Sequence, residues 1–188
     1  MENETSGKIE IPIHTHVGFG PFILQMIITE DILEDFNISI DQINDFGKQD
    51  DFKFSDREDD LLHQRLKMPF DVLSGYVEFF RQSVSAYLTM AKNSGAIISD
   101  EWTVTFNNAY LATCKSGSFI RSKAGSAGQL SCIAFLGMTD EDVARECDIT
   151  LSLPGSQSLF YKNKYKILPK TGDLYIFPSC FEISMNPV

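Results

Sequence analysis

Histidine is scarce in this chain, and the C-terminal half has none. The 188 residues contain three histidines, at His14, His16 and His63, and none follows Glu101. Imidazole is a common ligand of transition metals and the usual general base near neutral pH. The segment 101–188 therefore lacks the side chain on which most metal-dependent and triad-type enzymes rely.

Basic residues are few as well. The chain has 16 lysines and arginines against 26 aspartates and glutamates, which gives a formal net charge of −10. Affinity for nucleic acid comes mainly from clustered basic side chains that displace counterions. We therefore expect no nucleic-acid partner, and a surface suited to solubility or to docking against a basic protein surface.

Long apolar runs and paired cysteines are also absent. No stretch approaches the roughly 20 apolar residues that a membrane-spanning helix needs, and the polar first residues do not resemble a signal peptide. We expect no membrane partner, and a location in a cytoplasm or in a particle assembled there. The cysteines form no Cys-x-x-Cys pair and are predicted to be reduced, partly buried side chains: Cys114, Cys132, Cys147 and Cys180.

The first half of the chain has strand and helix patterns within a single predicted domain, 1–188. Residues 8–28 predict an extended segment that is apolar on both faces. Asp31 and Glu34 resemble an N-cap and its capping-box partner, which predicts a helix after that segment. We expect a strand and helices in the N-terminal part, residues 1–98.

A longer helix is predicted to begin near Pro69 and to end at Asn93-Ser94-Gly95. Apolar residues recur along it at helical spacing and form one stripe. We expect this stripe to pack on the β part rather than to form a partner groove. The residues expected to be buried there are Leu73, Val77, Phe80 and Val84.

The apolar period changes to two in the C-terminal part, residues 99–188. Turn residues separate the short predicted strands, and Thr171-Gly172-Asp173 is typical of a hairpin connection. Helices followed by short strands predict an α+β fold. The alternating residues are Trp102, Val104 and Phe106, then Tyr110, Ala112 and Cys114, then Leu130, Cys132 and Ala134.

Three motifs carry a family resemblance: Gly117-Ser118-Phe119, the segment 122–131, and the segment 168–179, which contains Gly172-Asp173-Leu174 and Phe177-Pro178-Ser179. Together they resemble the 2-oxoglutarate/Fe(II) oxygenase-like proteins of tailed bacteriophages. The resemblance implies a double-stranded β-helix, or jelly-roll, barrel with the N-terminal helices packed on its outside.

The ligand positions of that family are not kept. The resemblance puts Ala124 and Ser126 where the first two iron ligands belong, and Ile183 where the distal histidine belongs. It also implies a 2-oxoglutarate-binding arginine on a following strand, whereas this sequence ends at Val188. A non-haem iron site needs two imidazoles and a carboxylate on one face. We therefore expect no catalytic residues, no cofactor-binding residues and no metal ligands, and no cofactor.

Two other groups of residues are candidate metal ligands. His14 and His16 would point to one side of a strand, but a third ligand would have to come from elsewhere, with His63 the remaining histidine. Glu182 is a substitute candidate beside Ile183, but strand alternation directs it to the opposite face.

The family resemblance, together with the missing ligand residues, predicts a non-catalytic virion component. We expect it to be associated with the neck, tail or capsid and to be present in the host cytoplasm during assembly. Its expected partners are other phage structural proteins or further copies of the chain. An open barrel edge is expected near Val188, after the strand that holds Phe177, where another chain could add a strand. The alternatives are an Fe(II)/2-oxoglutarate-dependent hydroxylase with other ligands, and a small-ligand-binding module.

Overall fold

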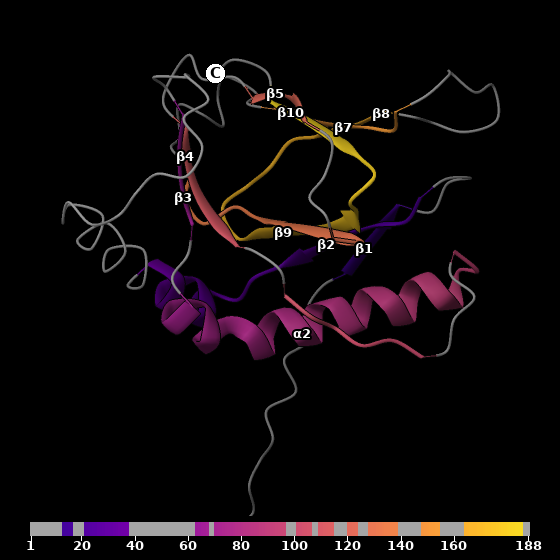
Figure 1. Ribbon diagram of the computed structural model, residues 1–188, viewed down its shortest axis with the longest axis horizontal. Coiled ribbons are helices and arrows are strands. Elements are labelled where there is room, and N and C mark those ends of the chain that lie inside the picture. Colours follow the sequence, from indigo (N-terminus) through magenta and orange to yellow (C-terminus); the bar gives the residue numbers. More distant parts are fainter. Residues whose placement is uncertain are drawn as a thin grey trace, which may run out of the picture.

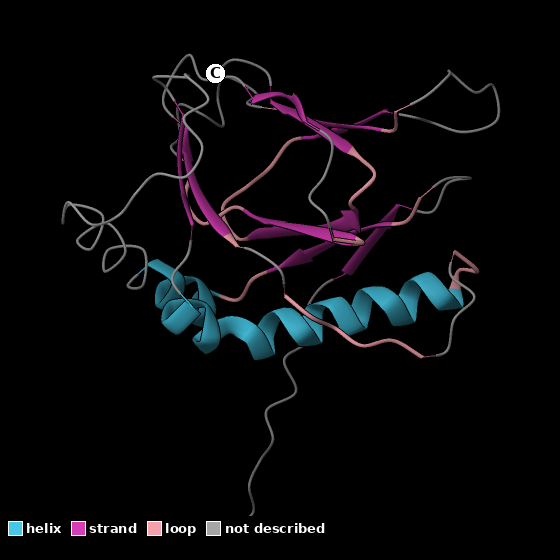
Figure 2. Ribbon diagram, in the orientation of Figure 1, coloured by secondary structure: helices cyan, strands magenta, loops and turns pink. Residues whose placement is uncertain are grey.

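The chain is α+β, as its sequence predicts. A computed structural model describes two four-stranded sheets, one two-stranded sheet and two helices within the residues that it places, and every strand pair among them is antiparallel. Figures 1 and 2 show the two larger sheets stacked, with the long helix beneath the lower one. The described residues are 13–16, 21–37, 63–67, 70–96, 101–106, 109–114, 120–123, 128–138, 148–154 and 164–185.

The sheet beside the helix has the strand order β1-β2-β9-β6. Its central strand β9 is buried from Asp173 through Phe177, because one face meets the helix and the other meets the second sheet. Near-continuous apolar sequence is typical of a strand that is covered on both faces. The four strands are β1 (Ile13–His16), β2 (Ile23–Ile27), β9 (Asp173–Pro178) and β6 (Leu130–Ala134).

The second sheet has the order β5-β10-β7-β8, and a separate pair joins β3 to β4. Tyr110–Cys114 is the predicted strand β4, whereas its partner β3, His63–Lys67, was not predicted. The sequence of β3 is mostly polar and has no alternation to mark it as a strand. The strands of the second sheet are β5 (Ile120–Lys123), β10 (Glu182–Met185), β7 (Ile149–Ser152) and β8 (Lys164–Ile167).

The described strands do not close into a barrel. The Thr171-Gly172-Asp173 turn also differs from expectation, because it carries the chain from β8 in one sheet to β9 in the other and so joins no hairpin. Gly172 adopts a φ of 90°, a conformation that side chains with a Cβ rarely adopt. The predicted turn at Thr171-Gly172 is confirmed, but a turn alone does not indicate which sheet receives the next strand.

The first helix begins slightly earlier than predicted. Residues 30–37 are helical, and the Leu33 amide donates to the Thr29 carbonyl at 2.9 Å. Thr29 therefore occupies the N-cap position and Asp31 lies in the first turn, where a carboxylate still faces the positive end of the helix dipole. The sequence also predicts that this helical region continues toward a cap at Gly47 and is followed by an exposed acidic loop from Lys48 to Asp60, and both lie outside the described residues.

Helix α2 spans Phe70–Asn93, as predicted. Gly95, with a φ of 75°, follows it, and the Ala96 amide donates to the Ala91 carbonyl at 2.8 Å. This is the left-handed glycine cap that the sequence indicated. Among the described residues no helix is long and apolar enough to cross a membrane.

The apolar face of α2 packs against β2 and β9 in a helix-side core. Its buried helix residues are Val84, Tyr87 and Ala91, while Val77 and Phe80 are half-buried. The predicted stripe is therefore shifted toward the C-terminal half of α2, and the side chain of Leu73 lies outside the described residues. The buried members of this core are Phe22, Leu24, Met26, Ile28, Val84, Tyr87, Ala91, Leu174 and Ile176.

Tyr87 connects α2 to the sheet beside it. Its hydroxyl donates to the Phe22 carbonyl at 3.0 Å, and the two rings meet edge to face at 5.3 Å. Burial, and then the neighbouring Cys180, raise the pKa of Tyr87 to about 12, so the phenol stays a donor at neutral pH. The hydrogen bond satisfies a carbonyl next to β2 while the ring covers apolar surface.

Residues 101–106 are extended but belong to no strand of the described part, which corrects the prediction of a strand there. Val104 packs on the helix-side core, and the Phe106 ring lies 6.2 Å from that of Phe80. Trp102 is 39% exposed. Alternation with a period of two indicates an extended backbone with one apolar and one polar face. Here the apolar face packs against a helix, and the segment pairs with no strand of the described part.

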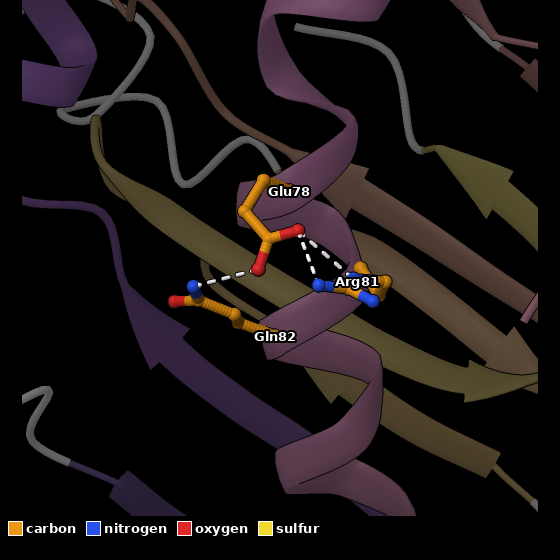
Figure 3. A network of polar contacts seen from close by, with 3 residues as sticks. All are labelled: Glu78, Arg81 and Gln82. Atoms are coloured by element: carbon orange, nitrogen blue, oxygen red, sulfur yellow. Dashed lines mark hydrogen bonds and ion pairs between the residues drawn. The ribbon is translucent and has the colours of Figure 1, made fainter.

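The outer face of α2 is polar (Figure 3). Glu78 accepts hydrogen bonds from Arg81 at 2.9 Å and from Gln82 at 3.0 Å, and all three side chains are exposed. The hydrogen bond from Gln82, and then Arg81, lower the pKa of Glu78. Exposed pairs of this kind contribute little stability, but they give this part of the helix a hydrated surface.

Leu174 and Leu168 offer a matched test of the helix-side core. Leu174 on β9 is 0% exposed, whereas Leu168 before the turn is 54% exposed. We expect Leu174→Ala to lower the free energy of unfolding by about 2–5 kcal/mol through lost transfer energy and a cavity. Leu168→Ala should change it by less than about 0.5 kcal/mol. Chemical denaturation of both variants measures the difference, and equal losses would contradict the assignment of β9 as the buried centre.

Candidate functional site

The candidate site is the region where the resemblance places iron ligands. Ile183 lies on β10, between β5 and β7, and stands opposite Lys123 and Leu151 in the register. Ala124 and Ser126 lie outside the described residues, but Ala124 directly follows Lys123 in the sequence. The described backbone therefore brings the distal ligand position beside the residue that leads into the first ligand motif.

Ile183 packs against an apolar core between the two sheets, which we call the inter-sheet core. The Phe181 ring contacts those of Phe177 and Tyr165, with centroid distances of 6.1 and 5.8 Å. Edge-to-face rings and aliphatic side chains offer no ligand to a metal ion. The buried members are Ile23, Ile149, Leu151, Ile167, Tyr175, Phe177 and Phe181, with Ile133, Phe135, Leu153, Tyr165 and Ile183 half-buried against them.

The other metal candidates lie on different strands. His14 and His16 are on β1, opposite Gln25 and Ile23, whereas His63 begins β3 in a separate sheet. Within the part of the chain that the structure describes, no three histidine, cysteine, aspartate or glutamate residues are grouped so that they could hold a metal ion. The structure therefore adds no third ligand to the His-x-His pair.

A polar cluster interrupts the inter-sheet face at the start of β9. The Asp173 carboxylate, 5% exposed, accepts hydrogen bonds from the Gln25 side chain at 3.1 Å and from the Lys170 amide at 2.8 Å. The Tyr175 hydroxyl makes a longer contact of 3.4 Å with the same carboxylate. A buried carboxylate needs such donors, because an unpaired charge is costly away from water.

The local sequence explains the cluster. Asp173 follows the turn residue Gly172, so its carboxylate reaches back to the turn amide at Lys170. Asp173 and Tyr175 are two residues apart on β9 and share one face, and Gln25 stands opposite Tyr175 on β2. Burial, and then the charge of Asp173, raise the pKa of Tyr175. The tyrosine is therefore a neutral donor and no candidate base at neutral pH.

Sequence reasoning placed Asp173 in a turn and in a family motif, but it did not predict this cluster. The available signal was an acidic residue placed directly before an almost wholly apolar strand, Leu174 to Phe177. An acid that is buried together with such a strand must find hydrogen-bond donors. Its partner Gln25 could not be found from sequence, because the pairing of β2 with β9 joins residues 148 positions apart.

Comparisons of the chain with protein-family models, curated proteins and solved structures found no match.

The described arrangement favours structural rather than chemical use of these groups. The Asp173 carboxylate is occupied by donors from the chain itself, and Ser131 and Ser179 pair with each other at 2.8 Å. A general base or a metal ligand needs an accessible lone pair. The hydrogen bonds of the cluster instead connect β2, β9 and the β8–β9 turn.

We expect Asp173→Ala to destabilise the fold. The change leaves Gln25 and the Lys170 amide without their acceptor, and hydrogen bonds to charged groups are worth about 1.5–3 kcal/mol each. Asp35→Ala, at an exposed helical position, is the control and should change the free energy of unfolding by less than about 0.5 kcal/mol. Thermal and chemical denaturation provide the measurement, and an Asp173→Ala protein as stable as the control would refute the structural role.

Proposed function

We propose that this chain is a non-catalytic, oxygenase-like structural or binding protein of a tailed-phage particle, acting at the neck, tail or capsid through protein–protein contacts. The observation that carries the non-catalytic part is the packing of Ile183, at the expected distal ligand position, against the apolar inter-sheet core. The placement in a virion rests on the three sequence motifs.

The strand pairing supports a jelly-roll form of the α+β fold. β7 pairs with β8, β6 with β9 and β5 with β10, so successive pairs are nested around one hairpin. The chain also crosses between the sheets from β5 to β6, from β6 to β7, from β8 to β9 and from β9 to β10. A hairpin whose two arms wind together between two sheets is the arrangement of a jelly roll.

The interior chemistry supports a binding role over catalysis. An iron oxygenase needs open coordination positions next to a polar ligand set, whereas isoleucine at position 183 supplies only apolar contact. The inter-sheet core around it is built from aromatic and aliphatic side chains of both sheets. Such an interior keeps the sheets in place and leaves the outer surface for recognition.

We expect the purified protein to bind no stoichiometric Fe(II). Ala124, Ser126 and Ile183 offer no imidazole or carboxylate at the aligned positions. Anaerobic iron titration with metal analysis after desalting measures the binding. Tight iron with two imidazole ligands in spectroscopy would refute the proposal and favour the hydroxylase.

A designed variant controls for the alignment itself. Ala124→His, Ser126→Asp and Ile183→His together restore the ligand types that the family uses. Weak iron binding by this triple variant, absent from the unchanged protein, would support the assigned positions. A triple variant that folds and binds no iron would contradict the alignment.

We expect the chain to copurify with assembled phage particles. Particles separated on a density gradient and washed in high salt should retain it at a constant ratio to the major capsid protein, measured by quantitative mass spectrometry. A soluble replication protein of the same phage serves as the control and should be lost. A chain that is lost with that control, is monomeric and binds no protein from infected cells would refute the structural proposal in favour of ligand binding.

A further inference from the structure

The open edge expected near Val188 falls on residues outside the described part, and the two C-terminal strands that the structure describes are not edge strands. β9, which holds Phe177, lies between β2 and β6, and β10 lies between β5 and β7, so both are central. The outer strands of the two larger sheets are β1 and β6 in one and β5 and β8 in the other. Within the described residues, a strand that another chain adds to either larger sheet would pair with one of these four.

Among those four strands, β6 lacks the usual protection of an edge. β5 contains Arg121 and Lys123, β8 contains Lys164 and Lys166, and β1 follows Pro12 and contains two histidines, whereas residues 128–138 carry no charge, no histidine and no proline. Charged residues, lysine above all, and proline are the common devices that keep sheet edges from pairing with other chains. The five residues of β6 are therefore the least defended edge.

The backbone hydrogen bonds define which groups of β6 point outward. The Phe135 amide donates to the Asp173 carbonyl at 2.9 Å, and the Gln129 carbonyl accepts from the Ser179 amide at 3.0 Å. Because antiparallel bonding alternates along a strand, the odd-numbered residues bond to β9. The amides and carbonyls of Leu130, Cys132 and Ala134 consequently point to the outer edge.

The side chains of β6 and of the residues after it are also only partly buried on both faces of the sheet. Ile133 and Phe135 are only half-buried on the inter-sheet face, and Leu130 and Ala134 are half-buried on the helix side. Cys132 is exposed, although the protein atoms around its sulfur desolvate it and raise its pKa to about 12. An apolar strand that is open on both faces at its edge would gain burial from one further strand.

We propose that two copies of this chain associate by antiparallel pairing of their β6 strands about Cys132. The outward amide and carbonyl of Leu130 then bond to those of Ala134 in the second copy. Cys132 stands opposite Cys132 of the second copy. A large side chain is thereby set against a small one at each end of the pair. The inference rests on the proposed function, since it names a contact through which that function is exerted.

Charge favours a second copy on this edge over a charged partner. Each chain carries a net charge of −10, yet residues 128–138 are uncharged, so this edge strand itself adds no charge repulsion when two copies meet there. A basic partner would instead be drawn to the acidic surface elsewhere. Because the pairing uses one five-residue strand from each copy, we expect a concentration-dependent dimer.

Analytical ultracentrifugation of the full chain tests the pairing. Cys132→Lys sets two ammonium groups opposite each other and should raise the dimer dissociation constant at least about tenfold. Cys180→Lys introduces the same charge at an exposed turn cysteine and should leave the constant unchanged. A wild-type protein that stays monomeric to its solubility limit, or a dimer equally stable in both variants, would overturn the proposal.

Amide hydrogen exchange supplies a readout that another mode of dimerisation would not give. The Cys132 and Ala134 amides should gain protection as the protein concentration rises, whereas the Ile133 amide, bonded to β9, should be protected throughout. Protection of Cys132 that does not change with concentration in a dimerising sample would overturn the β6 pairing. A monomer that still copurifies with particles would overturn it too, while leaving the proposed function intact.

Discussion

The fold depends on the burial of β9 between two cores. Leu174 and Ile176 face α2, and Tyr175 and Phe177 face the second sheet, so one strand contributes to both apolar cores. A strand covered on both faces cannot slip by one residue without moving the Asp173 carboxylate into an apolar environment. The hydrogen bonds of Asp173 to Gln25 and to the turn amide therefore fix the register that the two cores require.

Much of the local structure could be predicted from sequence. The long helix and its Gly95 cap follow from apolar spacing and glycine chemistry, and β4 and β6 follow from alternation. Pairing could not be predicted in the same way. Residues 101–106 alternate like a strand but cover α2, and β3 pairs although its sequence lacks alternation, because the partner of an extended segment is chosen by tertiary contacts.

The position of the candidate site stays a prediction from the sequence motifs, and the structure adds the surroundings of Ile183. The motifs located Ile183, and the register then placed it opposite Lys123, the residue before Ala124. The sequence alone could not indicate that Ile183 packs against Phe177 and Phe181 of the inter-sheet core, since those contacts depend on the order of the strands. The surroundings of Asp173 could not be predicted either. Its hydrogen-bond partners come from another strand and from a turn amide, and sequence patterns assign neither of them to Asp173.

An interior without metal must satisfy its polar groups from within the protein. Two imidazoles and a carboxylate left facing each other there would each need a hydrogen-bond partner or would remain desolvated at a cost of a few kcal/mol. Isoleucine at position 183 avoids that cost and adds apolar contact with the inter-sheet core. The carboxylate that the described interior does contain, Asp173, lies where a turn amide and a glutamine can reach it. The same physical requirement therefore accounts for the apolar side chain of Ile183 and for the acid at the turn.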